Sequence, residues 1–245
     1  MGFFSNLLRP FFVEPRVASA LRARPTSASR AIAGGEGTEV RIVGRIDPSS
    51  PTFPAPFTGE PCVFWFVCFE QETDTGMNRS SGKYERYWEI RVRDASREPL
   101  VLLDEDGESR VHVDLGRPPE SSASGEGPLH TSSADSRRDT LLRAPFLLDL
   151  PTEDVTARAL ANPSVEAFLN PGRDLSSSVL RVPALSAGGP HRSRCFEARL
   201  APGERLAVFG AVSGARAGTE SAYRSTSNGL RISGTSERPL VLLRP

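Results

Sequence analysis

Short runs of alternating apolar and polar residues dominate this chain, and residues typical of turns separate them. Such alternation predicts strands, because successive side chains of a strand point to opposite faces of a sheet. The predicted strands cover residues 37–46, 62–70, 84–93, 100–103, 111–113, 194–200, 205–213, 230–232 and 240–243. Because almost no helical pattern intervenes, we expect a mainly β protein with an antiparallel barrel-like or sandwich sheet.

The predicted strand 62–70 is unusual because both of its faces are apolar. One face carries Cys62, Phe64, Phe66 and Cys68. The other carries Val63, Trp65, Val67 and Phe69. A strand that is apolar on both faces is buried on both sides. We therefore expect it at the centre of its sheet, or covered on its outer face.

Composition divides the chain into two parts, residues 1–36 and a single β domain over 37–245. Residues 14–36 are rich in Ala, Arg, Ser and Gly and are interpreted as a linker. A low-complexity and helical insertion is expected to interrupt the β domain at about 115–192. Its first part, 115–140, has too few apolar residues to fold and is expected to be disordered. Its second part, 152–169, predicts the only substantial helix, broken by Pro163.

Paired hydrophobic residues recur every four positions at the N-terminus, which is a helical period. They are Phe3, Phe4, Leu7, Leu8, Phe11 and Phe12. Four arginines follow by position 24. The functional interpretation is an anchor that lies on the inner face of a membrane, with the rest of the protein in the cytoplasm. The alternative is a short amphipathic segment docked on its own domain.

Charge and cysteine content exclude several classes of function. Lys plus Arg equals Asp plus Glu at 30 each, so the chain lacks the cationic surplus of a general polyanion binder. The three cysteines contain no CxxC pair, which indicates reduced thiols in the cytosol. The acidic turn 104–108 does not have the spacing of an EF-hand and is interpreted as a solvated hairpin tip. No catalytic residue, metal or cofactor is predicted, and no apolar stretch is long enough to span a bilayer.

Two phrases carry the most specific pattern in the chain. The first supplies Pro56, Thr58, Gly59, Pro61 and Cys62 in a P-x-T-G-x-P-C arrangement. The second supplies Gly203 in the turn Leu200-Ala201-Pro202-Gly203-Glu204, followed by Gly210. Gly59 and Gly203 are expected to serve tight turns. Gly210 falls within a strand and is expected to mark a bulge or a sharp bend.

In order and spacing these phrases resemble the GIDE domain, also called the beside-a-membrane domain. This domain occurs in the Mulan-type mitochondrial ubiquitin ligase and in many bacterial proteins. The likeness also includes Val40–Ile46, Leu100–Asp114 and the closing Ile232-Ser233-Gly234, and it covers about residues 37–114 and 193–243.

The resemblance implies a non-catalytic interaction or regulatory module with an unidentified protein partner, close to a membrane. The ligase has a RING finger whose two zinc ions need eight Cys or His ligands. Three cysteines and three histidines cannot supply them, so no ligase activity of its own is expected. The alternative is a β-barrel that binds nucleic acid or another anionic ligand. Its binding face would be strand 84–93, with Tyr87, Arg91 and Arg93 outward and Trp88, Ile90 and Val92 toward the core.

Overall fold

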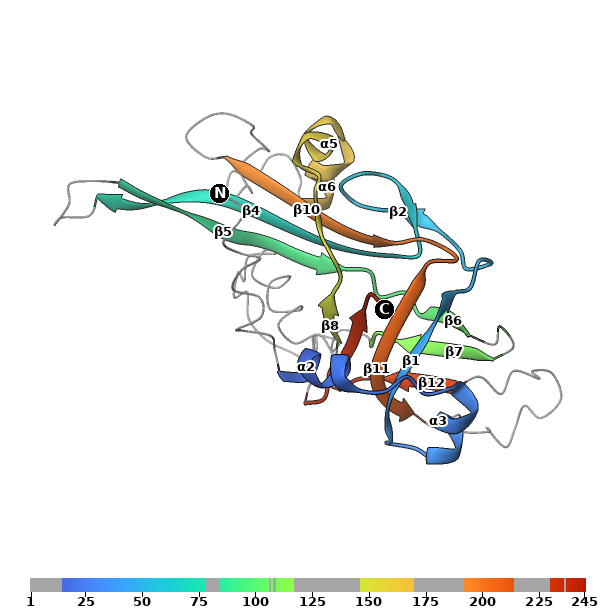
Figure 1. Ribbon diagram of the computed structural model, residues 1–245. Coiled ribbons are helices and arrows are strands. Elements are labelled where there is room, and N and C mark those ends of the chain that lie inside the picture. The colour runs from blue at the N-terminus through green and yellow to red at the C-terminus, as the bar shows by residue number, and fades with distance from the viewer. Residues whose placement is uncertain are drawn as a thin grey trace, which may run out of the picture.

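The computed structural model describes residues 15–77, 84–105, 107, 109–116, 146–169, 192–213, 230–235 and 237–245. Five strands pair in a closed order and form a barrel (Figure 1). They are β1 (Glu39–Ile46), β6 (Leu100–Asp104), β7 (Arg110–Asp114), β12 (Leu230–Ser233) and β11 (Arg205–Ser213), and β11 returns to β1. The predicted mainly β fold with a barrel-like sheet is confirmed.

The connectivity of this barrel is specific. Counted along the chain, its five strands follow the order 1-2-3-5-4 and return to 1. All pairs are antiparallel except the third with the fifth, β7 with β12, which run parallel. This is the connectivity of the oligonucleotide- and oligosaccharide-binding (OB) barrel. Topology of this kind describes the scaffold and does not assign a ligand.

Alternation along the strands fills the barrel. Val40, Ile42 and Ile46 of β1 are buried in one cluster, as their shared face predicts. The same cluster takes alternate residues of the other strands. These include Leu100, Leu102, Val111, Val113, Leu206, Val208, Leu230 and Ile232. Burial of this apolar surface is the main stabilising contribution to the barrel.

Gly210 pairs with Val40 in an unbroken register, so the expected bulge is absent there; on its other edge β11 changes partner from β13 at Phe209 to β12 at Ala211. A Cβ atom at this position would lie 2.8 Å from Ile232 Cγ2 and 2.9 Å from the carbonyl oxygen of Ser233. Glycine is therefore needed because β12 approaches closely at this position.

Two further strands extend the barrel sheet. β13 (Leu240–Leu243) pairs with β11, and β8 (Phe146–Asp149) runs parallel to β13. All four residues of β13 are buried, two toward the barrel core and two toward the helix α2 (Pro15–Arg22). The sequence pattern did not predict β8, which lies within the insertion expected at about 115–192.

A second sheet packs against the barrel and has the order β5 (Tyr84–Ala95), β4 (Phe64–Met77), β10 (Ser193–Leu200) and β9 (Glu153–Asp154). β4 lies between β5 and β10, which confirms the prediction of a central strand. Phe64 and Phe66 contact the barrel core, whereas Val67 and Phe69 belong to a separate core on the opposite face. The two apolar faces of this strand therefore join two cores.

Two short helices cover that opposite face. α5 (Thr156–Ala161) and α6 (Ser164–Leu169) meet at Asn162 and Pro163, so the predicted break is confirmed. Asp154 holds the first turn of α5, since its carboxylate accepts hydrogen bonds from both the N–H and the hydroxyl of Thr156. The buried residues of these helices pack with β4 in the second core. They are Val155, Ala159, Val165 and Leu169.

The expected linker at 14–36 was wrong over the described residues 15–34. These form α2 (Pro15–Arg22) and α3 (Ala28–Gly34), which pack on the outside of the barrel. Their buried residues are mainly small ones, Ala20, Ala28 and Ala31. Alanine is a good helix former, but alanine spacing gives little hydrophobic signal in a sequence.

The hairpin of β4 and β5 is longer than predicted, since the strands continue into the expected loop 71–83. Residues 78–83 at its tip lie outside the described residues, as do 117–145 and 170–191 of the expected insertion and the predicted anchor 1–14. The register of the hairpin shifts where Phe69 faces Val92 and Glu70 faces Ile90. β5 therefore does not alternate evenly.

Candidate functional site

The signature phrase forms a compact loop between two short strands, β2 (Phe53–Pro54) and β3 (Pro61–Cys62). The N–H of Ala55 donates to the carbonyl of Glu60 at 2.9 Å, and the N–H of Gly59 donates to the carbonyl of Ala55 at 2.8 Å. Gly59 has a φ of 73°, which a residue with a side chain adopts only with strain. The expected turn role of Gly59 is confirmed.

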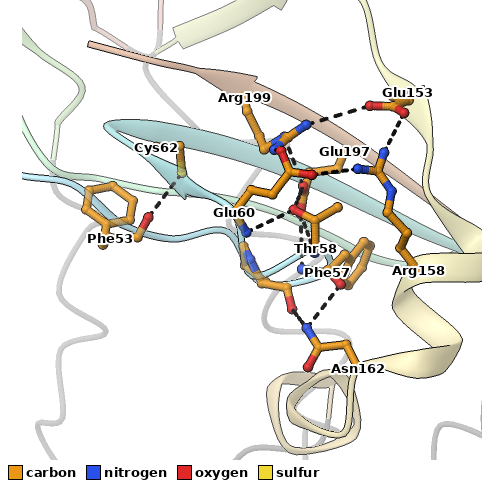
Figure 2. A network of polar contacts seen from close by, with 11 residues as sticks. Phe53, Phe57, Thr58, Glu60, Cys62, Glu153, Arg158, Asn162, Glu197 and Arg199 are labelled. Carbon is orange, nitrogen blue, oxygen red and sulfur yellow. Dashed lines mark hydrogen bonds and ion pairs between the residues drawn. The ribbon is translucent and has the colours of Figure 1, made fainter.

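One buried carboxylate, that of Glu197 on β10, holds this loop (Figure 2). The hydroxyl of Thr58 donates to Glu197 Oε1 at 2.6 Å, and the N–H of Phe57 donates to Oε2 at 3.0 Å. The N–H of Thr58 also lies 3.4 Å from Oε2. A buried carboxylate needs such partners because burial removes its water. Glu197 thus fastens the loop to the second sheet.

Charges of alternating sign surround this anchor. Arg199 lies 3.3 Å from Glu197 Oε1 and also contacts Glu60 and, at 3.7 Å, Glu153. Arg158 of α5 donates to Glu60 at 2.7 Å and to Glu153. Two arginines and three glutamates therefore satisfy one another across the loop, β10, β9 and α5 (Figure 2). This network holds the loop in place.

The loop is also tied to the two helices. Asn162 Nδ2 donates to the carbonyl of Phe57 at 3.1 Å. The Phe57 ring is fully buried and meets Phe168 of α6 edge-to-face, with ring centroids 6.0 Å apart. Phe168 meets Trp65 of β4 in the same way at 5.7 Å. The rings of Phe57, Phe168 and Trp65 therefore form a continuous series of contacts from the signature loop to β4.

At that surface lies a groove of about 940 Å³ between the barrel and the second sheet. Phe53, Val63, Trp65 and Phe168 form its apolar lining. The end of β5, the connection to β6 and the first residue of β6, together residues 94–100, form another wall and carry the charged groups of the groove. A concave, mainly apolar site with few polar groups is the usual form of a binding site in proteins.

The three cysteines are free and buried. Burial raises the pKa of Cys62 and of Cys68 to about 11 and that of Cys195 to about 12. The thiols are therefore protonated at neutral pH and poor nucleophiles. The Cys62 thiol donates a weak hydrogen bond of 3.4 Å to the carbonyl of Phe53. Its role is therefore to pack between β2 and β3. No cluster of three potential metal ligands occurs among the described residues.

The predicted site residues separate into two groups. Pro56, Thr58, Gly59, Pro61 and Cys62 lie together in the signature loop. Gly203 lies in the turn between β10 and β11, where its φ of 78° fits the expected role, and Gly210 lies within the barrel. The N-terminal hydrophobic residues Phe3 to Phe12 lie outside the described residues.

Sequence reasoning missed the groove and most of the network that supports it. Nothing in the local sequence indicates that the Glu197 carboxylate is buried. For Asn162 and Phe168 the sequence indicates only that they belong to the predicted helical segment 152–169, and not that they contact the loop or the groove. The two wall segments that meet at the groove are also distant in the sequence, so no local pattern joins them.

The alternative binding face on β5 belongs to the second sheet and not to the barrel. Its cations already have partners. Arg91 pairs with Glu89 at 3.0 Å, Arg86 lies 3.7 Å from Glu72, and Arg93 lies over the ring of Phe66 at 6.0 Å. The two ion pairs offset part of the positive charge that a polyanion would need.

The predicted orientation of β5 holds only in part. Val92 is buried, but Trp88 and Ile90 are partly exposed. Trp88 pairs with Glu72, just beyond the end of the pairing between β4 and β10, and the guanidinium of Arg194 covers its ring at 3.7 Å. The side chain of Tyr87 lies outside the part of the chain that the structure describes.

Comparisons with models of protein families, with curated proteins and with solved structures found no match for this chain. The resemblance to the GIDE domain therefore stays a prediction from the sequence. Within the described ranges, no helix has the length and apolar character needed to cross a membrane.

Proposed function

We propose that this chain is a non-catalytic interaction module of the GIDE kind, which lies against a membrane and binds a segment of a partner protein in the groove. The observation that carries the proposal is the groove itself, with Trp65 and Phe168 in its lining. The signature loop supports the groove because Phe57 packs against Phe168, one of the lining residues. The module has no ubiquitin-ligase activity of its own in this proposal.

The charges of the groove favour a basic partner. Burial lowers the pKa of the Arg97 guanidinium, and the nearby Asp94 carboxylate opposes that shift. Arg97 and Asp94 therefore offset each other. Glu98 is exposed at the wall and supplies the remaining negative charge. Aromatic rings such as Trp65 also attract cations. We thus expect an apolar or aromatic side chain next to a Lys or Arg in the partner.

A display library of random peptides, selected on the full chain, tests this proposal. Enriched peptides should carry an aromatic or large aliphatic residue beside a basic one. Glu98→Lys should weaken their binding about tenfold, which equals the loss of one charge-assisted contact. Phe168→Ala should weaken it as well.

Glu237→Lys is the matched control, because Glu237 is exposed and outside the groove. It should bind the peptides like the unaltered chain. Peptides that bind the Glu98→Lys and Phe168→Ala variants with unchanged affinity would contradict the proposed site, as would a selection that enriches nothing.

A further inference from the structure

The helices α2 and α3 concentrate positive charge in a chain that is neutral overall. Residues 15–35 contain four arginines and no acidic residue. Arg16 pairs with Glu39 and lies over the ring of Phe209. Arg22, Arg24 and Arg30 are exposed, and none of them has an ion-pair partner within the part of the chain that the structure describes. Three positive charges therefore face solvent in this region.

The same helices expose their large hydrophobic residues. Leu21 is 47% exposed and Ile32 is 53% exposed, and both stand out among the described residues as exposed large hydrophobic side chains. The helices pack on the barrel mainly through Ala20, Ala28 and Ala31 instead. This reverses the usual preference, in which leucine and isoleucine are buried. Single exposed hydrophobic residues are common, but here both lie on short helices that also expose three arginines, and hydrophobic and cationic side chains together are what a membrane interface attracts.

The two helices lie along the side of the barrel that faces away from the second sheet (Figure 1). α2 packs against β13 and α3 against β12, whereas the groove lies between the barrel and the second sheet. A flat surface that covers α2 and α3 therefore leaves the groove open to a partner.

We propose that α2 and α3 contact an anionic lipid surface, with Leu21 and Ile32 inserted at the headgroup level and Arg22, Arg24 and Arg30 on lipid phosphates. A lipid surface offers both kinds of contact, because acyl chains accept the hydrophobic side chains and anionic headgroups attract the arginines. Nucleic acid would use the arginines but not Leu21 and Ile32. The inference rests on the proposed membrane association and names its contact residues in the folded part of the chain.

Flotation of the full chain with phosphatidylcholine vesicles that contain phosphatidylserine tests this inference. The unaltered chain should float. The triple variant Arg22→Gln, Arg24→Gln, Arg30→Gln should bind on the order of a hundredfold more weakly, because each arginine near an anionic surface contributes about fivefold. Leu21→Ser with Ile32→Ser should also lose flotation. All five side chains are exposed, and thermal unfolding checks that the variants fold.

A matched triple variant, Arg110→Gln, Arg205→Gln, Arg244→Gln, removes equal charge from exposed arginines elsewhere and should float. A fourth variant, Phe11→Ser with Phe12→Ser, alters only the N-terminal hydrophobic segment. If that variant loses flotation while the α2–α3 variants keep it, the membrane association stands and this inference is wrong. If the unaltered chain does not float, both are wrong. Loss in the arginine variant alone would overturn the insertion of Leu21 and Ile32.

Discussion

The hydroxyl of Thr58 donates a 2.6 Å hydrogen bond to the buried carboxylate of Glu197, across 139 positions of the sequence. This bond joins the signature loop to the second sheet. It also explains why the loop has a threonine at this position, since valine has the same shape but no donor. The GIDE-like phrase is thus a structural device that shapes the neighbouring surface.

Glu197→Ala should lower the free energy of unfolding by about 3 kcal/mol or more, because it leaves the Thr58 hydroxyl, the Phe57 N–H and Arg199 without their buried partner. Thr58→Val should cost about 1–2 kcal/mol. Urea unfolding of both variants and of the double variant measures the coupling. A coupling energy near zero would contradict a direct interaction. Glu36→Ala, at an exposed site, should change stability by less than about 0.5 kcal/mol.

Gly210→Ala should destabilise the barrel by about 1–3 kcal/mol, because the new methyl group would meet Ile232 and the backbone of Ser233. Ile232→Ala removes Cγ2, one of the atoms that must move, so it should cost less stability in the Gly210→Ala background than in the unaltered chain. Equilibrium unfolding of the single and double variants provides the measurement. A Gly210→Ala protein as stable as the unaltered chain would mean that β12 lies farther from β11.

The three thiols should resist modification in the folded protein. Their pKa values of about 11 to 12 leave almost no thiolate at pH 8, and all three are buried. A colorimetric thiol reagent should therefore label the native chain slowly and label three cysteines rapidly in denaturant. Rapid labelling of one cysteine under native conditions would indicate a reactive thiol and reopen the question of catalysis.

Asp47 should contribute to a fall in stability at low pH. The hydroxyl and N–H of Ser49 donate to its carboxylate at 2.6 and 2.9 Å and, together with Arg110, lower its pKa. The charged form is favoured in the folded state, so this contribution is complete above the ordinary pKa of about 3.9 and is lost as pH falls through the lower folded value. The stability difference between the unaltered chain and Asp47→Asn should shrink from pH 7 to pH 3. A constant difference would argue against the shift.

The sequence predicted those parts of the fold that a local pattern within one element determines, such as alternation in a strand or a proline in a helix. Val40, Ile42 and Ile46 alternate and fill the barrel, and Pro163 breaks the helical segment where expected. The two apolar faces of the strand after Cys62 correctly indicated a central strand, because only a strand covered on both sides buries such residues.

Other features depend on contacts that no local pattern records. Helices α2 and α3 bury alanines, which have little hydrophobic signal, so the sequence predicts a linker there. The role of Glu197 depends on Thr58, which is far away in the sequence. The groove arises where the segments around Trp65, Arg97 and Phe168 meet, and only tertiary structure brings these together.

Hydrogen–deuterium exchange of the full chain, alone and saturated with a selected peptide, tests the central claim most directly. A partner segment in the groove should slow amide exchange in residues 94–100 and 164–169, which form or support its walls. Exchange in β1 and β11, inside the barrel, should not change. Protection confined to other surfaces, with exchange at 94–100 and 164–169 unaltered, would contradict the proposal that the groove is the binding site.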